Sequence, residues 1–247
     1  MTSEPAPTAR RNTGPSTAIR PSVGAPLLVA AGTLMMAGWL AAGVHRHTGL
    51  AAHDAAVTQW FVEARTPPLT AAAEVVTTLG SEPSITVLSG LLLAWLVVRR
   101  RLVAAAHVMA CTLLGAALIV GVKHLVARPR PPAYLVSGPP DTTYSFPSGH
   151  TLSSTIFFGL AAALVVLATR RRWARAAAVL GWFVASVAVA LSRVLLGYHW
   201  MTDVLAGWLL GVTVLAVACA TWTWHAPPAD GRESHDPYPG RDMERAR

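Results

Sequence analysis

Charged residues are scarce in this 247-residue chain: Asp, Glu, Lys and Arg make up only 13% of it, and Lys123 is the single lysine. Hydrophobic residues make up 53%, which places the chain in the membrane class rather than among ordinary soluble domains. The net charge of +8 comes from arginines gathered in short clusters between apolar runs. Charge arranged in this way indicates membrane topology, and we expect no nucleic-acid partner.

Cysteine is also rare, and the two that occur, Cys111 and Cys219, lie in apolar segments where they behave as small hydrophobes. Their spacing fits neither a disulfide framework nor a cysteine metal site, so redox chemistry is not indicated. His45, His47 and His53 lie near one another but lack carboxylate or cysteine partners at ligand spacing, and we interpret them as solvated loop residues. We therefore expect no metal and no cofactor.

Long apolar runs are what the sequence has in abundance. About 20 apolar residues, at 1.5 Å each, cross the ~30 Å hydrocarbon layer of a membrane. The second run is short, because a separate amphipathic stretch precedes it, and we expect it to extend by tilting. We predict an all-α fold, a polytopic bundle of six transmembrane helices. The expected spans are Gly24 to Val44, Ser84 to Val98, Leu102 to Val122, Thr151 to Ala168, Ala176 to Leu191 and Thr202 to Trp224.

The arginine clusters predict how the chain crosses the membrane. They precede the first span, separate the second from the third and the fourth from the fifth, and follow the sixth. Basic loops stay in the cytoplasm, so both termini are expected inside. We expect disordered cytoplasmic tails at 1–23 and 225–247 around a membrane domain of residues 24–224. The loop at 45–69 is then external, and we assign it no chemistry.

A polar stretch between the expected fifth and sixth spans contains the main candidate for a nucleophile. His199 and Asp203 are four residues apart, so they share a face if the last helix begins near the histidine. The carboxylate then accepts the proton of one ring nitrogen and leaves the other free to attack. Taken alone, the pair fits equally well a His–Asp contact that only caps a helix.

A second polar stretch, Pro147-Ser148-Gly149-His150, lies directly before the fourth span on the same predicted side. Ser148 is suited to cap the helix, whose N–H groups and positive dipole end favour an anion. His150 is placed to protonate a leaving oxygen, because its charge changes near neutral pH. An ordinary capped helix start is the simpler interpretation of this turn alone.

The third polar stretch follows the third span and contains Lys123 and Arg130. An ammonium and a guanidinium together suit the oxygens of a phosphate group. Both lie on the predicted external side, where topology does not call for positive charge. Pro129 and Pro131 stiffen the loop around Arg130. Arg128, two residues away, is a second-rank candidate because its side chain can point elsewhere.

In this order, Lys-x6-Arg-Pro, Pro-Ser-Gly-His and Ser-Arg-x5-His-x3-Asp resemble the three signature motifs of the type 2 phosphatidic acid phosphatase (PAP2) superfamily, which shares its pocket with vanadium haloperoxidases. The resemblance implies a metal-independent phosphatase. His199 would attack phosphorus with support from Asp203, and His150 would protonate the departing oxygen. The residues implied to hold the phosphate are Lys123, Arg130, Ser148, Gly149 and Arg193.

The resemblance also implies the class of substrate, a lipid phosphate monoester or a polyprenyl diphosphate. It would be hydrolysed through a phosphohistidine at the extracytoplasmic membrane surface while its chains remain in the bilayer. A vanadate-dependent haloperoxidase is one alternative, although those enzymes are larger and soluble. A non-catalytic phosphate-binding membrane protein is another, although it would not need a nucleophile with an orienting carboxylate. The sequence determines neither the individual lipid nor the oligomeric state.

Overall fold

The computed structural model describes residues 23–225, and its regular structure is entirely helical over that range. The predicted all-α fold is confirmed. Of the two expected tails, only Val23 and His225 fall among the described residues, so the disorder of the tails stays a prediction. The elements are α1 (Gly24–Arg46), η1 (Gly49–His53), α2 (Asp54–Glu63), α3 (Pro67–Leu79), α4 (Glu82–Val98), α5 (Leu102–Val126), η2 (Ala133–Leu135), α6 (Gly149–Ala168), α7 (Arg172–Leu195) and α8 (Met201–His225).

Helices α1, α5, α6, α7 and α8 are each long and apolar enough to cross a membrane. Helices α3 and α4 qualify only as a pair, joined at a bend of 45°, so the described residues hold five candidate spans, or six if this pair is one broken span. At the bend the hydroxyl of Ser81 accepts the N–H of Ser84, 3.3 Å away, and so caps α4. The predicted second span is therefore the second arm of this pair, and the amphipathic stretch before it is the first arm.

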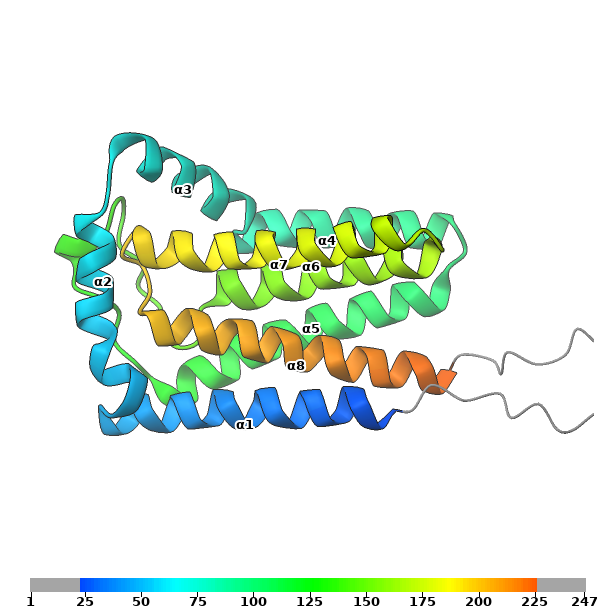
Figure 1. Ribbon diagram of the computed structural model, residues 1–247, viewed down its shortest axis with the longest axis horizontal. Coiled ribbons are helices and arrows are strands. Elements are labelled where there is room, and N and C mark those ends of the chain that lie inside the picture. The colour runs from blue at the N-terminus through cyan, green and yellow to red at the C-terminus, as the bar shows by residue number, and fades with distance from the viewer. Residues whose placement is uncertain (1–22, 226–247) are drawn as a thin grey trace, which may run out of the picture.

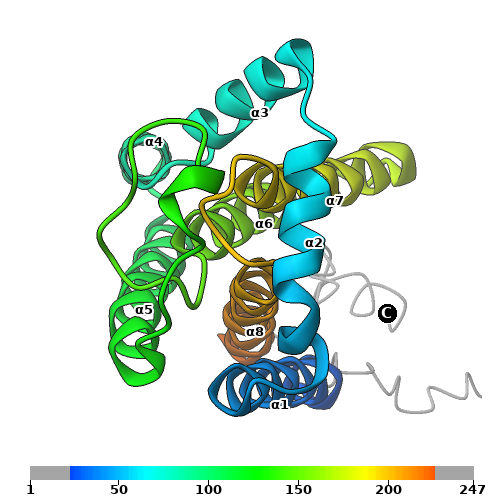
Figure 2. The same cartoon turned by 90° about the vertical axis from the view of Figure 1, so that its left-hand side faces the viewer.

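The long helices run side by side, and α2 lies across one end of the bundle (Figures 1 and 2). Within the bundle α1 packs along α8, and α6 packs against both α7 and α8. The α4–α5 and α6–α7 turns, which carry arginine clusters, lie at the end opposite α2 (Figure 1). The start of α1 and the end of α8 lie at that arginine-rich end as well (Figure 1).

Helices α5 and α7 each continue four residues past the expected ends of their spans. α5 runs to Val126 and α7 to Leu195, so Lys123 and Arg193 lie in the last turns of helices rather than in loops. Each expected span ends at the last apolar residue before a polar one. The backbone hydrogen bonds of a helix do not depend on whether its side chains are polar. A helix can therefore continue through polar residues when their side chains find polar partners.

Close packing of α6 against α8 joins two of the motif-bearing segments. A Cβ at Gly207 would lie 2.7 Å from the backbone oxygen of Ser148, and one at Gly211 would lie 2.7 Å from Thr155. Small residues four apart allow helices to approach closely in membranes. As a result the backbone N–H of Ser148 donates to the carbonyl of Asp203 at 3.0 Å. The start of α6 is thus fixed to the first turn of α8.

Candidate active site

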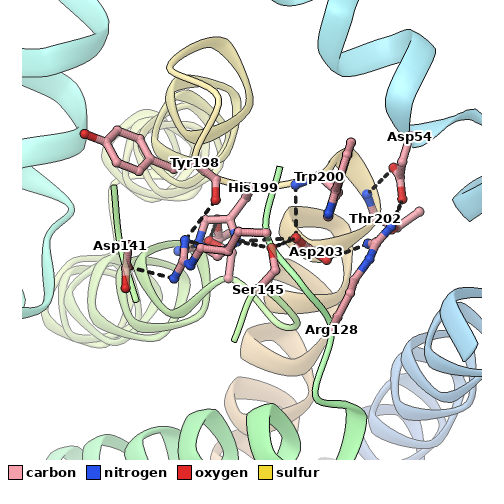
Figure 3. Close-up of polar contacts among 12 residues, drawn as sticks. Asp54, Arg128, Asp141, Ser145, Tyr198, His199, Trp200, Thr202 and Asp203 are labelled. Atoms are coloured by element: carbon pink, nitrogen blue, oxygen red, sulfur yellow. Dashed lines mark hydrogen bonds and ion pairs between the residues drawn. The ribbon is translucent and has the colours of Figure 1, made fainter. Parts of the chain in front are cut away.

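The three motif-bearing segments meet at the end of the bundle that α2 crosses (Figures 2 and 3). They are the last turn of α5 with the loop after it, the start of α6, and the α7–α8 turn. Their predicted convergence is thereby confirmed in position. Direct side-chain contacts join His199 to Asp203 and to Arg130, whereas Lys123 reaches Arg130 through a threonine.

His199 is presented by a tight turn between α7 and α8. Gly197 in this turn has a φ of 77°, and a Cβ there would lie 2.2 Å from the carbonyl oxygen of Leu135. Only glycine adopts this positive φ and allows so close an approach of another backbone without strain. The carbonyl of Arg193 accepts the N–H groups of Tyr198 at 3.0 Å and His199 at 3.3 Å. The side chain of His199 is held inside the protein and is 1% exposed.

One side of the imidazole faces a carboxylate. Nδ1 of His199 lies 3.4 Å from Oδ2 of Asp203, and the same oxygen accepts the backbone N–H of Trp200 at 3.0 Å. It also accepts a short hydrogen bond from the hydroxyl of Ser145. The predicted His–Asp pairing is present, although His199 lies just before α8 rather than on it. Asp203 is itself in the first turn and fully buried.

The other side of the imidazole faces a cation. Nη1 of Arg130 lies 3.3 Å from Nε2 of His199 and donates to the carbonyl of Tyr198 at 2.8 Å. Arginine can only donate, so Nε2 must be the acceptor and Nδ1 must carry the proton. A carboxylate beside Nδ1 favours the same tautomer. The lone pair on Nε2, which accepts from Arg130, therefore points toward the basic side of the site.

Burial determines the protonation state of this histidine. Desolvation lowers the pKa of His199 to about 4, although the hydrogen bond and charge of Asp203 act to raise it. Arg130 and Arg193 lower it further. The imidazole is consequently neutral at physiological pH, which is the form that can act as a nucleophile.

Arg130 is anchored by the loop before α6. Its Nε donates to the carbonyl of Thr143 at 2.7 Å, and its Nη2 donates to the Thr143 hydroxyl at 2.9 Å. Lys123 donates to the same hydroxyl at 2.7 Å. Asp141 completes the group with an ion pair of 2.7 Å to Arg130. Partial burial raises the pKa of Asp141, but the Thr143 N–H and the charge of Arg130 outweigh it and hold that pKa below its usual value.

Arg193 approaches from α7. Its Nη1 donates to the hydroxyl of Thr77 on α3 at 2.9 Å, and its guanidinium lies 4.1 Å from the centre of the Tyr198 ring. The side chain is 4% exposed, and its Nε has no hydrogen-bond partner among the described residues. An unpaired buried donor is costly, so this atom suits a ligand oxygen.

The start of α6 provides the remaining predicted residues. Ser148 caps the helix, as expected, by accepting the N–H of Thr151 at 3.4 Å. Gly149 begins α6, and a Cβ there would lie 2.4 Å from Oε1 of Glu82, the first residue of α4. His150 follows in the first turn of α6, where it is close enough to His199, Arg193 and Arg130 for their charges to act on it.

Arg128 points away from Arg130 and binds two carboxylates. Its Nη1 donates to Oδ1 of Asp203 at 2.6 Å, and its Nη2 to Oδ2 of Asp54 at 2.7 Å (Figure 3). Asp54 begins α2, within the 45–69 segment that was expected to carry no chemistry. No sequence motif identifies these contacts, since 74 residues separate Asp54 from Arg128.

The comparisons with known proteins agree with this geometry. The sequence profile of the PAP2 superfamily matches residues 104–227, about half of the chain and all three motifs. The chain belongs to the PAP2 superfamily.

Two curated relatives are each 40% identical to this PAP2 protein over their aligned parts. One is the undecaprenyl-diphosphatase of Sulfolobus acidocaldarius, aligned over 36% of this chain and 41% of that protein. The other is the decaprenylphosphoryl-5-phosphoribose phosphatase of Mycobacterium tuberculosis, aligned over 41% of this chain and 51% of that protein. The alignments thus span about half or less of these relatives.

Two crystal structures share the fold of the PAP2 protein. The transmembrane PAP2-type phosphatidylglycerolphosphate phosphatase of Bacillus subtilis aligns with a TM-score of 0.70 and 24% identity, covering 80% of this chain and 97% of that one. LpxE of Aquifex aeolicus aligns with a TM-score of 0.53 and 20% identity, covering 67% of this chain and 94% of that one. At these identities the likeness confirms the fold alone.

Proposed function

We propose that this protein is a membrane phosphatase that hydrolyses a lipid phosphate monoester or a polyprenyl diphosphate through a phosphohistidine on His199. One observation carries the proposal. The buried imidazole lies between Asp203 at Nδ1 and Arg130 at Nε2, so the unprotonated Nε2 faces a cation that would hold a phosphate and would attack once the phosphate takes over that guanidinium.

The reaction would take place in two displacements at phosphorus. In the first, Nε2 of His199 attacks, the N–P bond forms, and the bond from phosphorus to the leaving oxygen breaks. His150 gives its proton to that oxygen. In the second, water attacks phosphorus and passes a proton to His150 while the N–P bond breaks. Inorganic phosphate leaves, and both histidines return to their starting states.

The remaining motif residues would stabilise the charge on the phosphoryl oxygens. Arg130, Lys123 and Arg193 approach from a loop and from two different helices, which suits a group with three equatorial oxygens. Ser148 and Gly149 would contribute the N-terminal end of α6, where N–H groups and the helix dipole favour an anion.

A polyprenyl-linked phosphate is the substrate class we favour. The two relatives at 40% identity are named for undecaprenyl and decaprenyl compounds. A site at one end of a helical bundle, level with the membrane surface, would admit the headgroup while the prenyl chain stays in the hydrocarbon. The arginine-rich turns lie at the end opposite the site, and the positive-inside rule favours the cytoplasm for them, which supports an extracytoplasmic site.

The activity and its sidedness can be tested together. Detergent-purified protein should release phosphate from undecaprenyl diphosphate, phosphatidylglycerol phosphate or phosphatidic acid, and EDTA should not inhibit it. In sealed vesicles, a short-chain phosphatidic acid added outside should be hydrolysed by right-side-out membranes but by inverted ones only after detergent. If the protein released phosphate from none of the three lipids, the proposed activity would be refuted. Hydrolysis by sealed inverted vesicles alone would refute the orientation.

A further inference from the structure

Asp54 is a buried carboxylate that lies outside the three motifs and outside the segment matched by the family profile. It begins α2, the helix that crosses the end of the bundle next to the α7–α8 turn (Figure 2). Its side chain is 3% exposed, and both oxygens are bonded. Oδ1 accepts the backbone N–H of Thr202 at 3.0 Å, and Oδ2 accepts from the Thr202 hydroxyl and from Arg128.

These contacts connect Asp54 to His199 in three steps. Arg128 donates one nitrogen to Asp54 and another to Oδ1 of Asp203. With Oδ1 occupied by Arg128, the other oxygen of Asp203 is turned toward Ser145 and the imidazole. Arg128 also donates to the Thr202 hydroxyl at 2.8 Å, so one guanidinium fixes two consecutive residues of α8.

The geometry points to Asp54 as a positioning residue for the phosphatase reaction proposed above: it holds Arg128 and the first turn of α8 so that Asp203 orients His199. It touches neither substrate nor nucleophile, and the inference rests on the proposed function.

A charge count supports more than a structural role for this network. Asp54, Arg128 and Asp203 together carry one net negative charge when His199 is neutral. Phosphorylation of Nε2 leaves the proton on Nδ1, so the ring becomes cationic and the four groups become neutral overall. Without Asp54, the guanidinium of Arg128 would pair with Asp203 alone. The cationic ring would then form beside a pair whose charges already cancel, so no net negative charge would stabilise it.

Asp54 also stabilises the end of the helix that carries Asp203. The first N–H groups of a helix have no partners within it. In α8, Asp203 accepts the N–H of Trp200, which precedes the helix, and Asp54 accepts the N–H of Thr202. Two carboxylates at one helix start are favoured by its dipole. The depth and rotation of Asp203 relative to His199 therefore depend on a residue of α2.

The test compares Asp54→Asn with Glu63→Gln, a matched change at an exposed carboxylate of the same helix, which accepts a hydrogen bond from Gln59. Steady-state kinetics use the lipid that the screen above finds to be hydrolysed fastest. Because misplacing a reacting group by about 1 Å can cost about 100-fold, kcat of Asp54→Asn should fall about 10- to 100-fold, with KM within about twofold. Glu63→Gln should match the wild type.

The pH dependence separates positioning from simple loss of folded protein. Removing the negative charge of Asp54 leaves Arg128 less compensated, which disfavours the protonated imidazole. The acid limb of kcat/KM should therefore move to lower pH. The groups that face His199 from the other elements, Arg130, Arg193, His150 and Asp203, are unchanged in this variant. The midpoint of the limb does not depend on how much enzyme is folded, so it remains informative if the variant is unstable.

An Asp54→Asn enzyme with wild-type kcat and an unmoved acid limb would overturn the inference. A reduced rate with an unmoved limb would do so as well, because it would indicate a loss of folded protein only. Asp54→Glu, which restores the carboxylate, should recover part of kcat and return the limb toward the wild-type midpoint. If the wild-type protein hydrolyses none of the lipids, the proposed function fails first and the inference falls with it.

Discussion

At the scale of single residues, groups of opposite charge lie beside the two ring nitrogens of His199. Asp203 lies beside Nδ1 and Arg130 beside Nε2, both within 3.4 Å. In the proposed reaction the carboxylate would stabilise positive charge on the ring, and the guanidinium would attract a phosphate toward Nε2. The low pKa of His199 keeps the ring unprotonated, so its nucleophilic form is retained in moderately acidic solution.

Asp141 provides a residue-scale prediction, because it occupies the guanidinium that a phosphate would bind. Its carboxylate pairs with Arg130 at 2.7 Å, and its side chain is 35% exposed. A phosphate must displace or adjoin this negative charge. Asp141→Asn should therefore lower KM by about fivefold, which corresponds to the ~1 kcal/mol of a partly exposed ion pair. Steady-state kinetics would show this, and a raised KM would mean that Asp141 assists binding.

The sequence predicted the residues that form motifs but not those that support them. Lys123, Arg130, His150 and His199 stand at fixed spacings within short segments, and spacing is visible in a sequence. Ser145 contacts Asp203 across 58 positions, and only its place just before Pro-Ser-Gly-His could have drawn attention to it. Contacts of this kind depend on the three-dimensional packing of helices, which a single sequence does not encode locally.

At the scale of elements, the contact between α6 and α8 holds the start of α6, the proposed phosphate-binding segment, beside Asp203. Gly207→Ala should disturb it, because the new Cβ would lie 2.7 Å from the backbone oxygen of Ser148, which cannot rotate away. We expect a loss of about 1–3 kcal/mol in stability, as for other overpacked cores. Thermal unfolding in detergent should show a lower Tm, together with slower phosphate release.

The control for this variant is Gly181→Ala on α7, where a Cβ meets nothing within 4 Å. Alanine should be neutral or slightly stabilising there, since it favours the helix more than glycine does. Equal Tm values for the two variants would argue against close α6–α8 packing as a determinant of the site.

Element types were predicted more successfully than element ends. Hydrophobic runs of helical length identified five of the spans, but the pair α3 and α4 was expected as one short span preceded by a loose amphipathic stretch. Ser81 and the proline after it start a new helix, and that signal was present in the sequence. The helix α2 was not predicted, because its ten residues are too few to span a membrane and its buried carboxylate pairs only with distant partners.

At the scale of the whole molecule, the two ends of the bundle differ in what their charges do. At one end, the α4–α5 and α6–α7 turns contain consecutive arginines, which on the positive-inside rule favour the cytoplasmic side of the membrane. At the other end, Arg130 contacts His199 directly, and Arg128 contacts its carboxylate partner Asp203 (Figure 3). The fold shared with the Bacillus subtilis enzyme extends over most of the described chain, which fits a single unit built to hold that cluster.

The central claim is that His199 itself becomes phosphorylated, and trapping the intermediate tests it most directly. Purified protein would be mixed with lipid carrying radiolabelled phosphate, quenched in alkali within milliseconds, and digested for mass spectrometry. The account predicts an acid-labile, alkali-stable label on His199, and in His199→Ala no label and a turnover lower by about 10⁴-fold or more. His45→Ala, at an exposed histidine, should label normally. A label on another residue, or rapid turnover by His199→Ala, would contradict the account.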